Sequence, residues 1–204
     1  MRDFWWKALH GALKIGPYWD NIPGYEQRST CTHCGVPESL EHIWNECDAP
    51  GALEIWKGVQ DVLRRANVIV PQLSFAALLA APALSVRSHR NKPLAGRSRL
   101  LRIVLTESCH LIWKIRCERV IGREGDPTLY HSTAEIRKRW LHALNRRLNI
   151  DQALTSRALR RKSLNASLVC STWQGLLVDE QSLPEDWTSC QGVLVGKPTF
   201  WDHG

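Results

Sequence analysis

The residues best suited to chemistry in this chain are three cysteines and one histidine that lie within seventeen residues. Their spacing is Cys-x2-Cys-x7-His-x4-Cys, formed by Cys31, Cys34, His42 and Cys47. The two thiolates of a Cys-x-x-Cys turn can point at one ion, and a later imidazole and thiolate can complete a tetrahedron around it. Because protein atoms would fill all four positions and leave none for water, the spacing predicts one structural Zn²⁺. The alternative is a set of reduced cysteines without a metal.

Two neighbours of these four residues need a separate interpretation. His33 lies inside the Cys-x-x-Cys turn, where its backbone position makes it a poor ligand, so we expect it at the surface. The segment from Glu38 to His42 should be the short helix that delivers the imidazole. Trp44 is expected to pack in the core of this small finger, although an indole ring can also stack on a nucleic-acid base.

The remaining cysteines and the apolar segments indicate where in the cell the protein is located. Cys109, Cys117, Cys170 and Cys190 are scattered, and we interpret them as packing residues. The first residues, MRDFWWKALHG, contain no apolar secretory segment. The most apolar run, 75–84, is about half of the ~20 residues that a membrane span needs. We therefore expect an intracellular protein, in the nucleus or the cytoplasm, without a membrane partner. In such a compartment cysteines stay reduced, so we expect them to bind a metal ion and not to form disulfides.

Positive charge is concentrated in the middle of the chain. The net charge is +7, but the window 87–162 holds 19 of the 27 Lys and Arg and only 6 of the 20 Asp and Glu, which leaves +13 there and −6 elsewhere. A segregation of this kind favours contact with a polyanion, because Lys and Arg contacts to phosphate release counterions. The alternative is a solvated helical surface.

Hydrophobic periodicity predicts the elements that must carry these residues. Apolar positions at helical spacing indicate helices over 3–14, after Asp48, over 72–84 and over 98–123. The sequence Ser132-Thr133-Ala134-Glu135 has the S-x-x-E form of a helix start. The fold class should therefore be mainly α, with a small CCHC zinc-binding motif in a loop and short-helix segment, followed by a helical, basic body.

Four segments follow from this pattern. They are a Trp-rich helix with the CCHC motif (1–70), an apolar helix and basic connector (71–98), a basic helical pair (99–150), and a C-terminal helix and extended tail (151–204). The last helix is expected over 164–178, and the tail over 184–204 should pack through Trp187 and Trp201.

The basic helical pair supplies the candidate nucleic-acid contacts. Arginine outnumbers lysine here, which suits bidentate phosphate recognition. The candidate residues are Arg99, Arg102, Arg116 and Arg119 on the first helix and Arg137, Lys138, Arg139, Arg146 and Arg147 on the second.

Several segments together resemble one family. Residues 2–51 contain Cys31, Cys34 and Gly35, then Glu-Ser-Leu-Glu-His ending at His42, then Cys47. This region resembles the zinc-binding region near the reverse transcriptase of non-LTR retrotransposons, in the form seen in fungal elements. The segments LTESCHLIWKIRCERVI, IRKRWLHALNRRL and LPEDW are similar to the C-terminal part of the same polyproteins.

The resemblance implies a non-catalytic, zinc-binding and nucleic-acid-binding C-terminal module of a reverse transcriptase and ribonuclease H polyprotein, either as a fragment or as a free-standing relic. RNA or DNA would be the partner, and a reverse transcriptase or ribonuclease H domain a second one. The sequence shows no Y-x-D-D motif and no spaced carboxylates of the ribonuclease H kind. We therefore expect no enzyme activity from this chain.

Two alternatives remain. A retroelement nuclease would need an acidic residue two positions before a lysine to bind metal and activate water, and no lysine in the chain has one. An acidic cluster that could bind Mg²⁺ consists of Asp179, Glu180, Glu185 and Asp186, although a solvated tail explains it as well. The second alternative is a scaffold that docks onto a polymerase.

Overall fold

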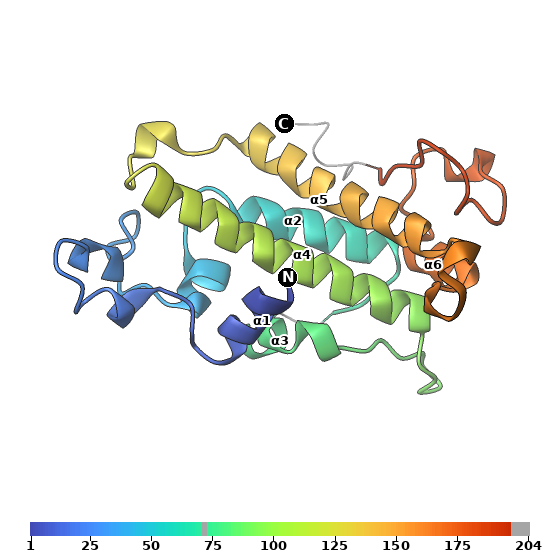
Figure 1. Cartoon of the computed structure of the whole chain (residues 1–204), viewed down its shortest axis with the longest axis horizontal. Helices are drawn as coiled ribbons and strands as arrows, with labels where there is room; N and C mark the ends of the chain where they lie inside the picture. Colours follow the sequence, from blue (N-terminus) through green and yellow to red (C-terminus); the bar gives the residue numbers. More distant parts are fainter. Residues whose placement is uncertain (71–72, 197–204) are drawn as a thin grey trace.

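Helices form almost all of the regular structure in this chain. The computed structural model describes residues 1–70 and 73–196, and over these ranges the fold is mainly helical and without named strands (Figure 1). The helices are α1 (Arg2–Leu9), α2 (Ala52–Arg65), α3 (Phe75–Leu79), α4 (Ala95–Cys117), α5 (Thr133–Leu154) and α6 (Ala166–Trp173). Two π-helical turns lie at His42–Glu46 and Glu118–Gly122.

Helix α4 is the central element. It contacts α2, α5 and α6, and the view in Figure 1 shows α5 running alongside it. Its buried positions include Leu101, Val104, Leu105 and Ile112, which recur at helical spacing and fill the space between its neighbours. The loops between α1 and residue 40 extend toward the end of the molecule where α4 terminates. The CCHC segment and the end of α4 therefore lie close together.

The start of α5 confirms the predicted N-terminus. Ser132 is the N-cap, and its hydroxyl accepts a hydrogen bond from the Glu135 backbone N–H at 3.2 Å. The carboxylate of Glu135 makes a different contact from the one that the S-x-x-E pattern predicts, since it binds Nδ1 of His131 at 2.6 Å. Only half of the capping box is formed, because the buried imidazole competes for the carboxylate.

Other predicted boundaries need correction. The helix over 3–14 ends at Leu9, because His10 is its C-cap and Gly11 has a φ of 61°. The helix over 72–84 is confined to α3, and a 3₁₀ turn containing Pro82 follows it. The helix over 98–123 starts earlier, at Ala95, and its last predicted residues form the π-helical turn Glu118–Gly122.

The C-terminal helix is shorter than the predicted range 164–178. Helix α6 starts after Asn165, whose side chain accepts from Ser167 N, and ends at Trp173. Trp187 is buried, as expected for the packed tail. Trp201 lies outside the described residues.

One hydrophobic core joins the four predicted segments. Its buried residues run from Phe4 to Val195 and include Trp44, Trp140 and Trp173, which are almost completely buried. A second, much smaller cluster consists of Cys31, Cys47 and Ala49, with Cys34 packed against it. The cysteine segment thus has little apolar packing of its own. Among the described residues, no helix has both the length and the apolar character to cross a bilayer.

A glycine at the contact of α4 with α6 gives a first testable prediction. A Cβ at Gly96 would lie 2.6 Å from the Ser171 carbonyl oxygen and 2.5 Å from its hydroxyl oxygen. We expect Gly96→Ala to lower the free energy of unfolding by about 1–3 kcal/mol, because the backbone of α6 must shift. Urea unfolding measures this. Gly122→Ala is the control, since a Cβ there meets no atom within 4 Å, and equal stability of the two variants would contradict the prediction.

Candidate metal centre and basic groove

The four residues predicted as metal ligands come together. One potential ligand atom from each of Cys31, Cys34, His42 and Cys47 lies within 4.8 Å of all the others. Sγ of Cys47 is 3.8 Å from Sγ of Cys31 and 3.9 Å from Sγ of Cys34. In a tetrahedron with metal–sulphur bonds of about 2.3 Å, two sulphur atoms are about 3.8 Å apart. The cluster could therefore hold a metal ion.

The Cys-x-x-Cys turn is held by its own backbone. The Gly35 N–H donates to the Cys31 carbonyl oxygen at 2.8 Å, and the Cys31 N–H donates to the Val36 carbonyl oxygen at the same distance. Gly35 has a φ of 71°, a conformation that costs glycine little. An isolated bridge between Thr30 and Pro37 closes the hairpin. Both thiols of the turn thus face one point.

The histidine begins the π-helical turn His42–Glu46, and the third cysteine follows this turn directly. The Ser39 hydroxyl accepts from the His42 N–H at 2.9 Å, and the Cys47 N–H donates to the His42 carbonyl oxygen at 2.7 Å. Nδ1 of His42 lies 3.7 Å from the Glu46 carboxylate. Nε2 is buried and has no hydrogen-bond partner within the described part of the chain. A metal would satisfy this nitrogen, and a carboxylate on the other side is the usual support for a ligating imidazole.

The sulphur atoms also influence one another's protonation. The hydrogen bond between Cys47 and Cys31 lowers the pKa of Cys31 to about 3. The same contact, together with burial, raises the pKa of Cys47 above its ordinary value. Metal binding would displace the protons that these thiols still hold.

The other residues singled out beside the motif have clear positions. His33 is exposed, with its ring centroid 5.9 Å from that of Tyr130. Trp44 is fully buried in the main core, and its Nε1 donates to the Cys109 carbonyl oxygen at 3.2 Å. Its ring therefore does not reach a base, and it fastens the finger to α4. Cys109 is buried, whereas Cys117, Cys170 and Cys190 are half-buried.

Two of the predicted nucleic-acid contacts are inside the protein. Arg116 and Arg119 are buried, at 2% and 5% exposed. Nε of Arg116 donates to Glu38 Oε1 at 3.0 Å, and its Nη2 contacts the other carboxylate oxygen. Nη2 of Arg119 lies 3.7 Å from Sγ of Cys47. The expectation of phosphate contacts is therefore not met for this pair, because the cysteine segment covers this side of α4.

Ion pairs engage three further candidates. Arg99 donates to both oxygens of Asp151 at 2.5 and 2.6 Å, and Nε of Arg147 lies 3.3 Å from the same carboxylate. Arg137 donates to Glu54 at 2.5 Å. These guanidinium groups neutralise carboxylates of the protein, which lowers their availability to a polyanion.

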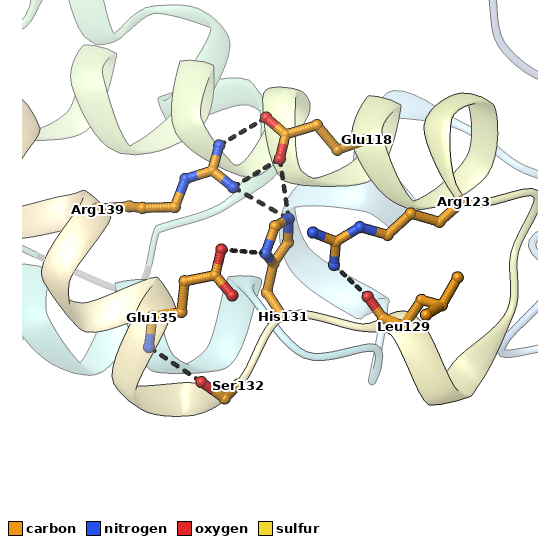
Figure 2. Close-up of polar contacts among 7 residues, drawn as sticks. All are labelled: Glu118, Arg123, Leu129, His131, Ser132, Glu135 and Arg139. Atoms are coloured by element: carbon orange, nitrogen blue, oxygen red, sulfur yellow. Dashed lines mark hydrogen bonds and ion pairs between the residues drawn. The ribbon is translucent and has the colours of Figure 1, made fainter.

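Arg139 belongs to a four-residue network at the junction of α4 with α5. Figure 2 shows its guanidinium donating to both carboxylate oxygens of Glu118, each at 2.6 Å. Nε2 of the buried His131 lies 2.9 Å from Glu118, and Nδ1 contacts Glu135. The hydrogen bond from Arg139 is the largest of the contacts that lower the pKa of Glu118.

The remaining candidates retain accessible charge. Lys138 and Arg146 are exposed, and Arg102 is half-buried. Within the described ranges, none of these three forms an ion pair with a carboxylate.

Lys138 and Arg146 line a groove between α4 and α5. The groove has a volume of about 410 Å³ and is also lined by Lys114, His110 and His142. Sequence reasoning missed these three as site residues, although Lys138, His142 and Arg146 recur every four residues and so share one helix face.

The charges that surround the groove are mainly positive. Burial lowers the pKa of His110, and the positive charges of the N-terminus, Lys114 and Arg146 lower it further. Glu107 is the single acidic side chain among the described residues that line the groove, and burial raises its pKa. The groove can therefore attract an anion.

Comparisons of this chain with protein families, with curated proteins and with solved structures give no match.

Proposed function

We propose that this chain is a non-catalytic, zinc-binding module that binds RNA or DNA, derived from the C-terminal part of a retrotransposon reverse transcriptase and ribonuclease H polyprotein. The observation that carries the proposal is the pairing of a closed Cys₃His cluster with a groove lined by lysine, arginine and histidine. The resemblance of residues 2–51 to a retroelement zinc-binding region supports the same proposal.

Zinc suits the donor set. Three thiolates and one imidazole are soft and borderline ligands that favour Zn²⁺ over the hard cations Mg²⁺ and Ca²⁺. Because the protein supplies four ligands, the ion would hold the fold and leave no position for substrate. Its role would be to order the cysteine segment, which packs few apolar residues of its own.

The groove between α4 and α5 would hold the phosphate backbone. Lys114, Lys138 and Arg146 can each approach a phosphate, and the release of counterions would drive binding without sequence readout. The polymer would bind in the nucleus or cytoplasm, either alone or beside a reverse transcriptase domain.

The test is the salt dependence of nucleic-acid binding. We expect replacement of Lys114, Lys138 and Arg146 by Ala to lower the slope of log K against log salt by about 0.7–0.9 for each phosphate that the protein no longer neutralises. Fluorescence anisotropy with a labelled single strand and a labelled duplex, each at several salt concentrations, measures the slope.

A matched variant removes the same charge elsewhere. Lys57, Arg90 and Lys92 are exposed, and none of them lines the groove. Their replacement by Ala should leave the slope closer to that of the wild type. An equal change in both variants would contradict the assignment of the groove. Failure of the wild type to bind either strand form would favour the alternative in which the chain is a scaffold for a polymerase.

A further inference from the structure

A buried arginine beside the cysteine cluster lacks the partner that a buried charge normally has. Arg119 lies in the π-helical turn Glu118–Gly122 and is 5% exposed. Its nearest sulphur contact is Cys47, at 3.7 Å from Nη2. Its Nε is buried without a hydrogen-bond partner in the described part of the chain. Arg116, one helical turn earlier, shows the usual arrangement, since the buried carboxylate of Glu38 neutralises it.

Burial of an unpaired guanidinium is costly, so a stable fold needs an anion next to Arg119. No carboxylate within the described ranges forms an ion pair with it. The Tyr130 ring, 5.6 Å from the guanidinium carbon, adds a cation–π contact but no negative charge. The sulphur atoms of the cluster are the remaining source of negative charge at this position.

The charge of the cluster matches this need when a divalent ion is bound. Three thiolates, one neutral imidazole and one divalent cation carry a net charge of −1, and the guanidinium adds +1. The bound cluster would therefore neutralise the buried guanidinium, which lies 3.7 Å from one of its sulphur atoms.

We propose that Arg119 is the built-in counter-charge of the metal centre, and that it adapts the cluster to a divalent, thiolate-binding cation. This inference rests on the proposed function, since it requires that the cluster binds metal. Arg119 is a positioning residue: it touches a ligand and not the ion. Because it follows directly from α4, the bound metal would also attach the cysteine segment to the end of that helix.

The experiment compares three variants of the full chain. Arg119→Met removes the charge and keeps the apolar stem, Arg119→Lys keeps the charge, and Arg123→Met changes a nearby half-buried arginine that donates to the Leu129 carbonyl oxygen (Figure 2). Competition with a chromogenic chelator gives the Zn²⁺ affinity. The Co²⁺-loaded form gives the ligand-to-metal absorption of the thiolates.

We expect Arg119→Met to weaken Zn²⁺ binding by about 10–100-fold, the usual cost of losing a group that supports a metal ligand. Arg119→Lys and Arg123→Met should bind Zn²⁺ nearly as well as the wild type. The Co²⁺ spectrum should keep its tetrahedral thiolate bands in all variants, because the four ligands are unchanged.

The outcomes separate the two proposals. No metal in the wild type would overturn both of them. One metal per chain with equal affinity in the wild type and Arg119→Met would overturn only the counter-charge. Equal losses in Arg119→Met and Arg119→Lys would overturn it as well, in favour of a packing role. Should Arg119→Met not fold at saturating zinc, Arg119→Gln takes its place, since the amide removes the charge and stays polar.

Discussion

Cys34→Ala, and removal of metal from the wild type by a chelator, are expected to unfold the segment between α1 and α2. The free energy of metal binding is folding free energy where a site is not preformed in the unfolded chain, and structural zinc contributes about 10–16 kcal/mol in small zinc-finger peptides. Here the ligands hold together a region whose own buried cluster consists of Cys31, Cys47 and Ala49.

Elemental analysis and thermal melting check this expectation. The wild type should contain about one zinc per chain and melt at a lower temperature with chelator, whereas Cys34→Ala should lose the metal. Cys190→Ala is the matched control, because this half-buried cysteine lies outside the cluster. Identical melting with and without chelator would show that the cluster is not a structural metal site.

Asp151→Ala is expected to cost about 3–5 kcal/mol, the usual result of removing one member of a buried charged pair. Asp151 is completely buried. It accepts two hydrogen bonds from Arg99 and one from Nε1 of Trp173 at 3.0 Å, so it connects α4, α5 and α6. Its loss leaves the guanidinium groups of Arg99 and Arg147 and the Trp173 indole N–H without this carboxylate.

Urea unfolding of Asp151→Ala against Asp20→Ala measures this cost. Asp20 is an exposed carboxylate, and its replacement removes the same charge without touching the core. The Asp20 variant should stay within about 0.5 kcal/mol of the wild type. A similar stability of both variants would mean that the helices pack equally well without the carboxylate.

Features built from residues close together in the sequence were predicted correctly, and features built from distant residues were not. The four cysteine and histidine positions came together as predicted, since the Cys-x-x-Cys turn and the His42–Cys47 turn are each built from neighbouring residues. The start of α5 was predicted correctly for the same reason, because Ser132 caps a backbone N–H three residues ahead.

The basic surface was harder to predict, because distant residues decide which charges stay accessible. Arg99 pairs with a carboxylate 52 residues away, and Arg137 with one 83 residues away. Neither distance leaves a local pattern in the sequence. The sequence pattern of α4 suggests that Arg116 and Arg119 are surface residues. The cysteine segment packs over this side of the helix and buries them. The groove exists only once α5 lies against α4.

The network around His131 has a consequence for how the groove meets a ligand. Its imidazole is enclosed between Glu118, from the end of α4, and Glu135, from the start of α5, and Arg139 completes the set. Such a cross-link fixes the sliding register of one helix along the other. The backbone positions that carry Lys114 and Lys138 are then set before anything binds. A polymer that enters the groove would order the exposed lysine and arginine side chains but would not have to reposition the helices that carry them.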